Sequence, residues 1–334
     1  NDNDNDNDNG NDESDDNGRK KTHRYKNGDT FQGFIDGDGL RQGHGIFTDA
    51  KSGTTYEGEW KDSKRHGKGV LITSSTKYDG EFVMDKKEGQ GTLILNDLSS
   101  YNGQFEGGFF HGKGVLCDTG GDRVYKGDFE NGLRDGLGEE TLLDGTFYSG
   151  EYKEGKIHGF GTLRKHEGGP IIYSGQWSDD RYDGEGVFFG DDGSKYEGVF
   201  VRGQKSGHGV LKMSDREPAA TEVLVQKGKW LRDVPTNGNW MVTYRDSSIF
   251  SGNATIGDNQ EPIPHGFGTK KFKNGDIYTG EFVHGKREGN GLCVFQNGDK
   301  WDGAWSDDAI GKHDRGVLTF KDGTTHNFGD NEQN

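Results

Sequence analysis

The chain has 334 residues and a formal net charge of -16, with 59 glycines, five prolines and an aromatic content of 11%. So much glycine with so little proline excludes a collagen-like chain or a proline-rich linker, and the acidic charge argues against a general nucleic-acid binder, which needs clustered Lys and Arg. A hydrophobic content of 28% argues against a large conventional core, whereas the aromatic content argues against a fully disordered chain.

The N-terminal segment is strongly acidic. Its first eighteen residues hold seven Asp and one Glu with no Lys or Arg, and no apolar residue precedes Tyr25. We therefore expect residues 1–24 to form a disordered, solvated tail, either a plain low-complexity extension or an acidic docking arm. No apolar run is long enough to span a membrane, no signal peptide is visible, and there are only two cysteines. These features predict a cytoplasmic, reducing location.

A repeat begins directly after this tail. The pattern is aromatic-x-Gly-x-aromatic, followed about seven residues later by Gly-x-Gly, and its cleanest copy is Tyr56 to Trp60 followed by His66 to Val70. About twelve copies run from residue 27 to residue 320, mostly 22 to 25 residues apart, which is the mark of a repeat architecture. Clear copies start at Tyr56, Tyr78, Tyr101, Tyr125, Tyr148, Tyr173, Tyr196 and Tyr278, and looser copies at Phe31, Gln226, Phe250 and Trp301.

Each copy predicts a β-hairpin. The two-residue spacing of Tyr56, Gly58 and Trp60 places all three on one face of a strand, and the second strand carries Gly67, Gly69 and Leu71 on one face. Turn dipeptides such as Asn-Gly and Asp-Gly separate the copies. Glycine weakens a strand unless something approaches it closely, so we expect rings of one strand to lie over glycines of its neighbours.

These residues resemble the MORN (membrane occupation and recognition nexus) repeat, whose pattern is Tyr-x-Gly-x-Trp/Phe followed by Gly-x-Gly-x-apolar. The resemblance covers about 290 of the 334 residues. It implies an all-β fold, an elongated single-layer antiparallel sheet of about twelve stacked hairpins with an aromatic-lined groove. With two strands per hairpin and about 4.8 Å per strand, such a sheet would extend roughly 115 Å.

The regularity of the repeat suggests a division of the chain. Regular repeats occupy 25–211, degenerate repeats with insertions occupy 212–264, C-terminal repeats occupy 265–328, and a short tail follows at 329–334. In the degenerate part Gln226 replaces the first aromatic residue, and Trp240 stands where the second glycine of Gly-x-Gly belongs. The segment 212–264 is open to two interpretations, a drifted repeat without a role of its own, or a partner site or hinge.

Catalytic and metal chemistry find little support. The Gly-x-Gly elements precede strands, whereas phosphate-binding glycines open a helix. Histidines recur just before Gly-x-Gly, but equivalent positions in successive hairpins lie about 10 Å apart, while zinc ligands lie about 2.1 Å from the metal. We therefore predict a protein that is not an enzyme, with no catalytic residues, no metal and no cofactor.

The favoured function is a scaffold that binds a partner helix or extended peptide along the aromatic groove. The resemblance implies such a role in a cytoskeletal, ciliary or membrane-associated assembly. The predicted groove residues are Tyr56, Trp60, Tyr78, Phe82, Tyr101, Phe105, Tyr125, Phe129, Tyr148, Tyr152, Tyr173, Trp177, Tyr196 and Phe200.

Two alternatives follow from the same resemblance. One is a membrane-recruitment module that binds phosphoinositides or another anionic phospholipid. Its candidate headgroup contacts are Lys61, Lys64, Arg65, Lys68, Lys86 and Lys87. The other is the regulatory repeat region of a larger lipid kinase or lysine methyltransferase.

Overall fold

The computed structural model describes residues 21–214, 222–310 and 315–329. These residues contain 27 strands and no helix. The chain divides into two compact units, the first comprising Asn1–Gly145 and Tyr152–Gly155 and the second Thr146–Glu151 and Lys156–Asn334. Of the predicted N-terminal tail, residues 1–20 lie outside the described residues, as do 330–334 of the C-terminal tail. Thr22–Arg24, which we expected to belong to the tail, instead forms a strand that pairs with the first repeat.

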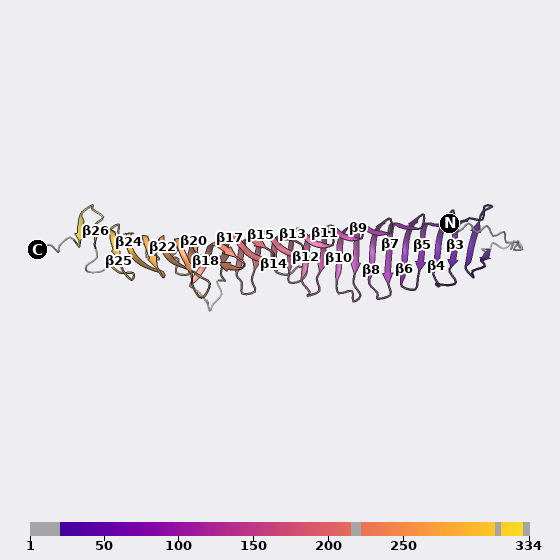
Figure 1. Cartoon of the computed structure of the whole chain (residues 1–334), viewed down its shortest axis with the longest axis horizontal. Coiled ribbons are helices and arrows are strands. Elements are labelled where there is room, and N and C mark those ends of the chain that lie inside the picture. The colour runs from indigo at the N-terminus through magenta and orange to yellow at the C-terminus, as the bar shows by residue number, and fades with distance from the viewer. Residues whose placement is uncertain (1–20, 215–221, 311–314, 330–334) are drawn as a thin grey trace. The chain divides into compact units, whose positions relative to one another are not determined.

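The first unit is an antiparallel sheet in which each strand pairs with the next one along the chain, from β1 to β11. Its hairpins stand side by side in a single layer (Figure 1). The strands are β1 (Thr22–Arg24), β2 (Thr30–Ile35), β3 (Arg41–Thr48), β4 (Thr55–Lys61), β5 (Lys64–Ile72), β6 (Thr76–Val83), β7 (Lys86–Leu95), β8 (Ser100–Glu106), β9 (Phe109–Cys117), β10 (Val124–Glu130) and β11 (Leu133–Thr141).

The second unit repeats this arrangement. Strands pair in chain order, except that β19 pairs only with β18, which continues to β20. The strands are β13 (Lys156–Arg164), β14 (Ile171–Ser178), β15 (Arg181–Phe189), β16 (Lys195–Val201), β17 (Gln204–Lys212), β18 (Val223–Leu231), β19 (Val234–Pro235), β20 (Gly238–Tyr244), β21 (Ile249–Ile256), β22 (Pro262–Lys271), β23 (Ile277–Val283), β24 (Lys286–Val294), β25 (Lys300–Trp305), β26 (Gly316–Thr319) and β27 (Thr325–Phe328). Strand β12 (Phe147–Lys153) has residues in both units.

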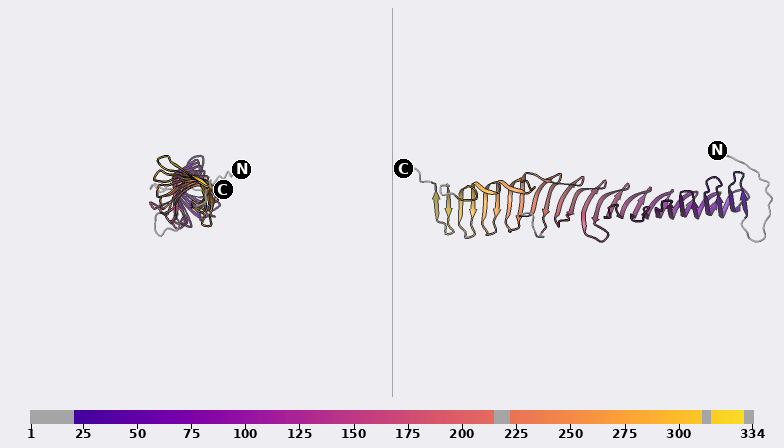
Figure 2. Two further views of the ribbon diagram at one scale, coloured as in Figure 1. Left: turned by 90° about the vertical axis from the view of Figure 1, so that its left-hand side faces the viewer. Right: turned by 90° about the horizontal axis from the view of Figure 1, so that it is seen from below.

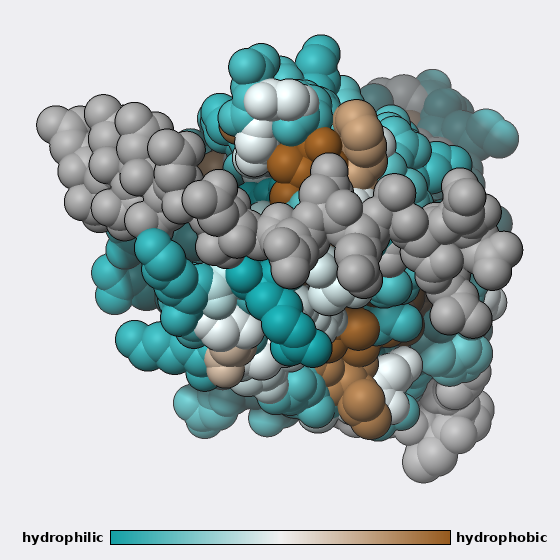
Figure 3. All heavy atoms as spheres, turned by 90° about the vertical axis from the view of Figure 1, so that its right-hand side faces the viewer, coloured by the Kyte–Doolittle hydropathy of each residue, from teal (hydrophilic) through white to brown (hydrophobic). Residues whose placement is uncertain are grey.

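The predicted fold class is confirmed for each unit. The described residues are all-β and antiparallel, and no second sheet or helix covers the strands in any of the three views (Figures 1 and 2). Seen from the end of the molecule that holds β3, the surface is mostly hydrophilic, with hydrophobic residues in small separate groups (Figure 3). The large aromatic residues of the repeats are buried within the layer itself.

The core of each of the eight regular repeats is one tyrosine ring lying over two glycines. In the hairpin of β4 and β5, Gly58 pairs with Gly69, and a Cβ atom added to Gly69 would lie 2.4 Å from the hydroxyl oxygen of Tyr56. Only glycine leaves room for this ring. The hydroxyl group donates a hydrogen bond of 3.0 Å to the carbonyl of Glu59, so its polar end is satisfied although the ring is buried.

Within each unit the rings of successive repeats form a chain of edge-to-face contacts, from Phe31 to Tyr152 in the first unit and from Tyr148 to Trp240 in the second. The Tyr56 ring lies 5.0 Å from that of Trp60 in its own strand and 5.2 Å from that of Phe82 in the next repeat, both nearly perpendicular to it. This is the preferred arrangement for aromatic pairs. It lets a single-layer sheet with few aliphatic residues bury a core, as the composition had suggested.

The hairpin tips are tight turns, and several of them carry no turn-forming dipeptide. Asp62 and Ser63 connect β4 to β5 with φ angles of 51° and 63°, the left-handed pair found in two-residue hairpin turns. Most of the Asn-Gly and Asp-Gly turn signals lie in the loops between repeats, but Asn131-Gly132 forms the tip between β10 and β11. A second unpredicted feature is a register shift between Gly58 and Glu59, where Gly67 of β5 adopts a φ of +55°.

The degenerate ninth repeat continues the ladder, since β18 pairs with both β17 and β20. Gln226 has no aromatic ring, and the Trp240 ring lies over the glycine in its place. Atoms of the Trp240 ring are 2.4 Å from the position that a Cβ of Gly228 would occupy. Trp240 and Gln226 are both buried. The ring has therefore moved from one strand of the hairpin to the other while the ring-over-glycine contact persists.

Candidate functional site

The fourteen predicted groove residues form the core of the sheet. Each is at most 6% exposed, and the tyrosines that begin the regular repeats are at most 2% exposed. We expected part of this stripe to be accessible because no second layer covers it. That accessibility is not found, and binding of a partner to these rings stays a prediction that would require their cover to move.

The cover comes from side chains at the start of the second strand of the hairpin. The guanidinium carbon of Arg41 lies 4.2 Å from the centre of the Trp60 ring, and the Lys87 ammonium lies 5.0 Å from that of Tyr78. In other repeats an aromatic residue takes this place, as where Phe110 stacks on Tyr101 at 3.8 Å. Burial against the rings lowers the pKa of Lys87. These side chains close the aromatic face from above.

The six predicted headgroup contacts do not share one face. Arg65 pairs across the ladder with Trp60 and Lys87 pairs with Phe82, which places both on the aromatic face. Lys68 pairs with Glu81 on the opposite face, and the remaining three, Lys61, Lys64 and Lys86, alternate to that opposite side near the hairpin tips. Arg65 is also engaged, since its Nε atom lies 2.9 Å from an oxygen of Asp85. Phospholipid binding by this set stays a prediction.

The face opposite the rings carries a groove in the second unit. A groove of about 860 Å³ crosses six neighbouring strands, from β13 to β18. Its floor is the backbone of an unbroken row of paired glycines, Gly161, Gly175, Gly186, Gly198 and Gly209. Because the tyrosine rings occupy the other side of this row, we call this surface the glycine-face groove.

Two ridges of side chains border the groove, one on each side of the glycine row. The first ridge follows the pairing register and consists of Thr162, Ser174, Val187, Glu197, Val210 and Lys227. The second ridge consists of Phe160, Glu185, Val199 and His208. Over the central strands valines alternate with Glu185, Glu197 and His208, so that three apolar side chains lie among polar ones.

One repeat in this groove lacks the side-chain hydrogen-bond acceptor that the other regular repeats have at the same position. In seven of the eight regular repeats the fourth residue of aromatic-x-Gly-x-aromatic is Glu, Gln or Asp. Its side chain lies over the first glycine of Gly-x-Gly. In the seventh repeat, for example, Gln176 accepts a hydrogen bond of 2.8 Å from the amide of Glu185. The eighth repeat has Val199, which carries no acceptor, and the hydrogen bond from the Tyr196 hydroxyl is also longest there, at 3.5 Å.

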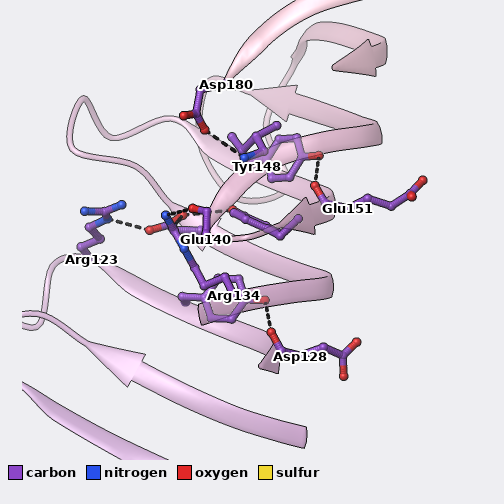
Figure 4. Close-up of polar contacts among 11 residues, drawn as sticks. Arg123, Asp128, Arg134, Glu140, Tyr148, Glu151 and Asp180 are labelled. Carbon is purple, nitrogen blue, oxygen red and sulfur yellow. Dashed lines mark hydrogen bonds and ion pairs between the residues drawn. The ribbon is translucent and has the colours of Figure 1, made fainter. Parts of the chain in front are cut away.

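A buried ionic cluster occupies the fifth repeat. Glu140 is 2% exposed and stands opposite Tyr125, at the position where Leu71 stands opposite Tyr56. Arg123 donates to its carboxylate at 2.6 Å, Arg134 forms a second, short contact, and the Tyr152 hydroxyl donates at 3.0 Å (Figure 4). Both carboxylate oxygens of Glu140 have hydrogen-bond or ion-pair partners from the same unit, which indicates a structural role for Glu140.

The described residues offer no other chemical centre. Among residues 21–214, 222–310 and 315–329, no group of three or more His, Cys, Asp or Glu side chains could hold a metal ion. In the same part of the chain there is no helix long and apolar enough to cross a membrane. Cys117 and Cys293 are free thiols, and burial raises the pKa of the Cys293 thiol.

Comparison with known proteins identifies the repeat. The family model of the MORN repeat matches ten segments, at 38–54, 56–75, 78–99, 101–123, 125–147, 148–169, 173–195, 196–216, 263–277 and 278–300. The unmatched stretch between 216 and 263 contains the displaced ring Trp240. No curated protein matches the chain.

Among solved structures, the chain is similar to PorZ, described as an essential surface component of the type-IX secretion system of Porphyromonas gingivalis. The sequence identity is 10% and the TM-score 0.12, and the match covers 91% of this chain and 57% of that one.

Proposed function

Because the chain belongs to the MORN repeat family, whose repeats are in general a non-catalytic module, we propose that it is a non-enzymatic scaffold that binds a protein partner in the glycine-face groove. The partner presents a helix or an extended peptide. The proposed setting is a cytoplasmic assembly at the cytoskeleton, a cilium or a membrane, and this setting rests on the family resemblance alone.

The observation that carries the proposal is the groove itself. Its 860 Å³ is within the range of ligand sites in proteins, which combine apolar side chains with a few polar groups, as this groove does. Phe160 at one end is 61% exposed, and exposed apolar side chains of this kind are typical of binding surfaces. The aromatic stripe has a different part in this proposal, because its buried rings hold the glycine floor in place from the other side.

A pair of matched variants tests the proposal. Val210 lies in the groove and Val70 occupies the same repeat position in the first unit, and both side chains are partly exposed on the same kind of face. Val210→Asp replaces one of the three valines of the groove by a carboxylate, so a partner recovered with the wild-type protein by affinity purification and mass spectrometry should be lost. Val70→Asp makes the same chemical change outside the groove and should leave the partner bound.

Trp177→Ala separates the two faces. If the partner binds the rings, a Trp177→Ala protein that remains folded loses it while Val210→Asp keeps it, and the proposal is then wrong. Equal recovery of every bound protein by the wild type and Val210→Asp would also refute it. Far-ultraviolet circular dichroism of each variant shows whether the sheet is intact.

A further inference from the structure

The glycine-face groove has one charged side chain near each end of its row of three valines. Glu185 lies on the second ridge in β15 and Lys227 on the first ridge in β18, and both side chains are exposed. Glu197, between them, already has Lys195 as a partner at 3.2 Å. Glu185 and Lys227 make no ion pair with any residue that the structure describes. A ligand therefore meets a free negative charge at one end and a free positive charge at the other.

Three valines lie between these two charges, in alternation with Glu197 and His208. Val187 and Val210 stand on the first ridge and Val199 on the second, one valine for each of the strands β15, β16 and β17. Val199 is the residue that replaces the polar fourth position of the other regular repeats. The repeat thus gives up a hydrogen bond at the one place where an apolar side chain completes this surface.

The dimensions of the groove select an extended ligand. The two ridges are two residues apart along each strand, about 6.8 Å, whereas a helix with its side chains is about 10–12 Å wide. Glu185 and Lys227 are three strand spacings apart, or about 14 Å along the groove. At about 3.3 Å per residue, an extended peptide covers that distance in about four residues.

We propose that the glycine-face groove recognises an extended peptide segment in which a basic and an acidic residue lie about four positions apart with apolar residues between them. The basic residue faces Glu185, the acidic residue faces Lys227, and the apolar residues lie on the three valines. This inference rests on the proposed function, because it specifies the ligand of the same groove.

The test is a selection from a random dodecapeptide library against the purified full chain. Enriched peptides should contain Lys or Arg about four positions from Asp or Glu, with apolar residues between. Glu185→Lys makes both ends of the groove basic, so those peptides should bind the variant about tenfold more weakly. Peptides with an acidic residue at both ends should then bind the variant better than they bind the wild type.

The control is Glu57→Lys, which changes the net charge equally at an exposed position of β4 on the same face, in the first unit. It should leave the affinity for the selected peptides unchanged. The converse variant, Lys227→Glu, should favour peptides with a basic residue at both ends. Circular dichroism confirms that each variant keeps its sheet.

The outcomes separate the two levels of the proposal. If no peptide is enriched over the library background, both this inference and the proposed groove function are wrong. If peptides are enriched and Val210→Asp abolishes their binding, but they lack the charge pattern or lose affinity equally with Glu57→Lys, the groove function stands and this inference is overturned.

Discussion

Replacing Gly58 by alanine gives the sharpest test of the ring-over-glycine core. The new Cβ would lie 2.5 Å from the Gly69 Cα, 2.5 Å from the Tyr56 hydroxyl oxygen and 2.6 Å from the Lys68 carbonyl oxygen. Carbon atoms in contact normally stand about 3.5–4.0 Å apart, so each neighbour would have to retreat by about 1 Å. Two of the three are backbone atoms of the paired strand, and they cannot move that far without breaking ladder hydrogen bonds.

The magnitude follows from these contacts. Overpacking in a close-packed site costs about 1–3 kcal/mol. Displacing the Tyr56 ring also breaks its 3.0 Å hydrogen bond to the Glu59 carbonyl, which costs about 0.5–1.5 kcal/mol more. We expect Gly58→Ala to destabilise this hairpin by about 2–4 kcal/mol. Gly37→Ala is the control, because a Cβ at Gly37 meets nothing within 4 Å, and it should be neutral or stabilise by up to about 1 kcal/mol.

Hydrogen exchange followed by mass spectrometry is the suitable assay, because repeat proteins open locally and a global melting curve would average over the repeats. Amides of β4 and β5 should exchange faster in Gly58→Ala by a factor of about 30 to 1000, which corresponds to the expected loss of stability. Strands several repeats away should be unaffected. If Gly58→Ala and Gly37→Ala protect β4 and β5 equally, the rings are not packed against the glycines and the account of the core is wrong.

Three further predictions concern the core. Glu140→Gln removes the carboxylate that holds two arginines and should destabilise the fifth repeat by about 3 kcal/mol, whereas Glu139→Gln, at the exposed neighbouring position, should change its local hydrogen exchange little. Trp240→Ala uncovers Gly228 and should cost the ninth repeat about 3–5 kcal/mol, against little for the exposed Met241→Ala; equal effects of this pair on urea unfolding would contradict the ring replacement. Burial raises the pKa of Tyr56 and of Tyr101 to about 12 from the ordinary 10.0. Because the folded state favours the neutral phenol, the stability of the fold is fully present below pH 10 and falls as the pH rises towards 12. Phenolate absorbance should therefore appear together with loss of the sheet signal in an alkaline titration, and phenolate formation at pH 10 with the sheet intact would refute it.

The sequence predicted the architecture because the information is local and repeated. Tyr56, Gly58 and Trp60 alternate along one strand, and that parity alone places ring and glycine on one face whatever the rest of the chain does. The same pattern at every repeat predicted the stacked hairpins and the contact of rings with glycines. The hairpin tip at Asp62 and Ser63 escaped prediction because the left-handed turn is imposed by the twist of the paired strands and not by a turn-forming dipeptide.

What the sequence could not show depends on neighbours that are distant along the chain. The pattern predicted an exposed aromatic groove, yet Arg41 and Lys87 close the ring face, because a residue's height above the sheet and its contacts with a neighbouring repeat are properties of packing. Likewise, Trp240 substitutes for a missing ring only because β20 pairs with β18.

By itself, then, the sequence determined the repeat, the hairpins, the face of each residue and the absence of a recognisable catalytic motif, since all of these follow from spacing along the chain. Only the tertiary structure decided which of the two faces is closed and which is open. Glu185, Val199 and Lys227 lie far apart in the sequence and are unremarkable in it. They come to one groove because six strands align their glycines in register, and register is set by the pairing of whole strands.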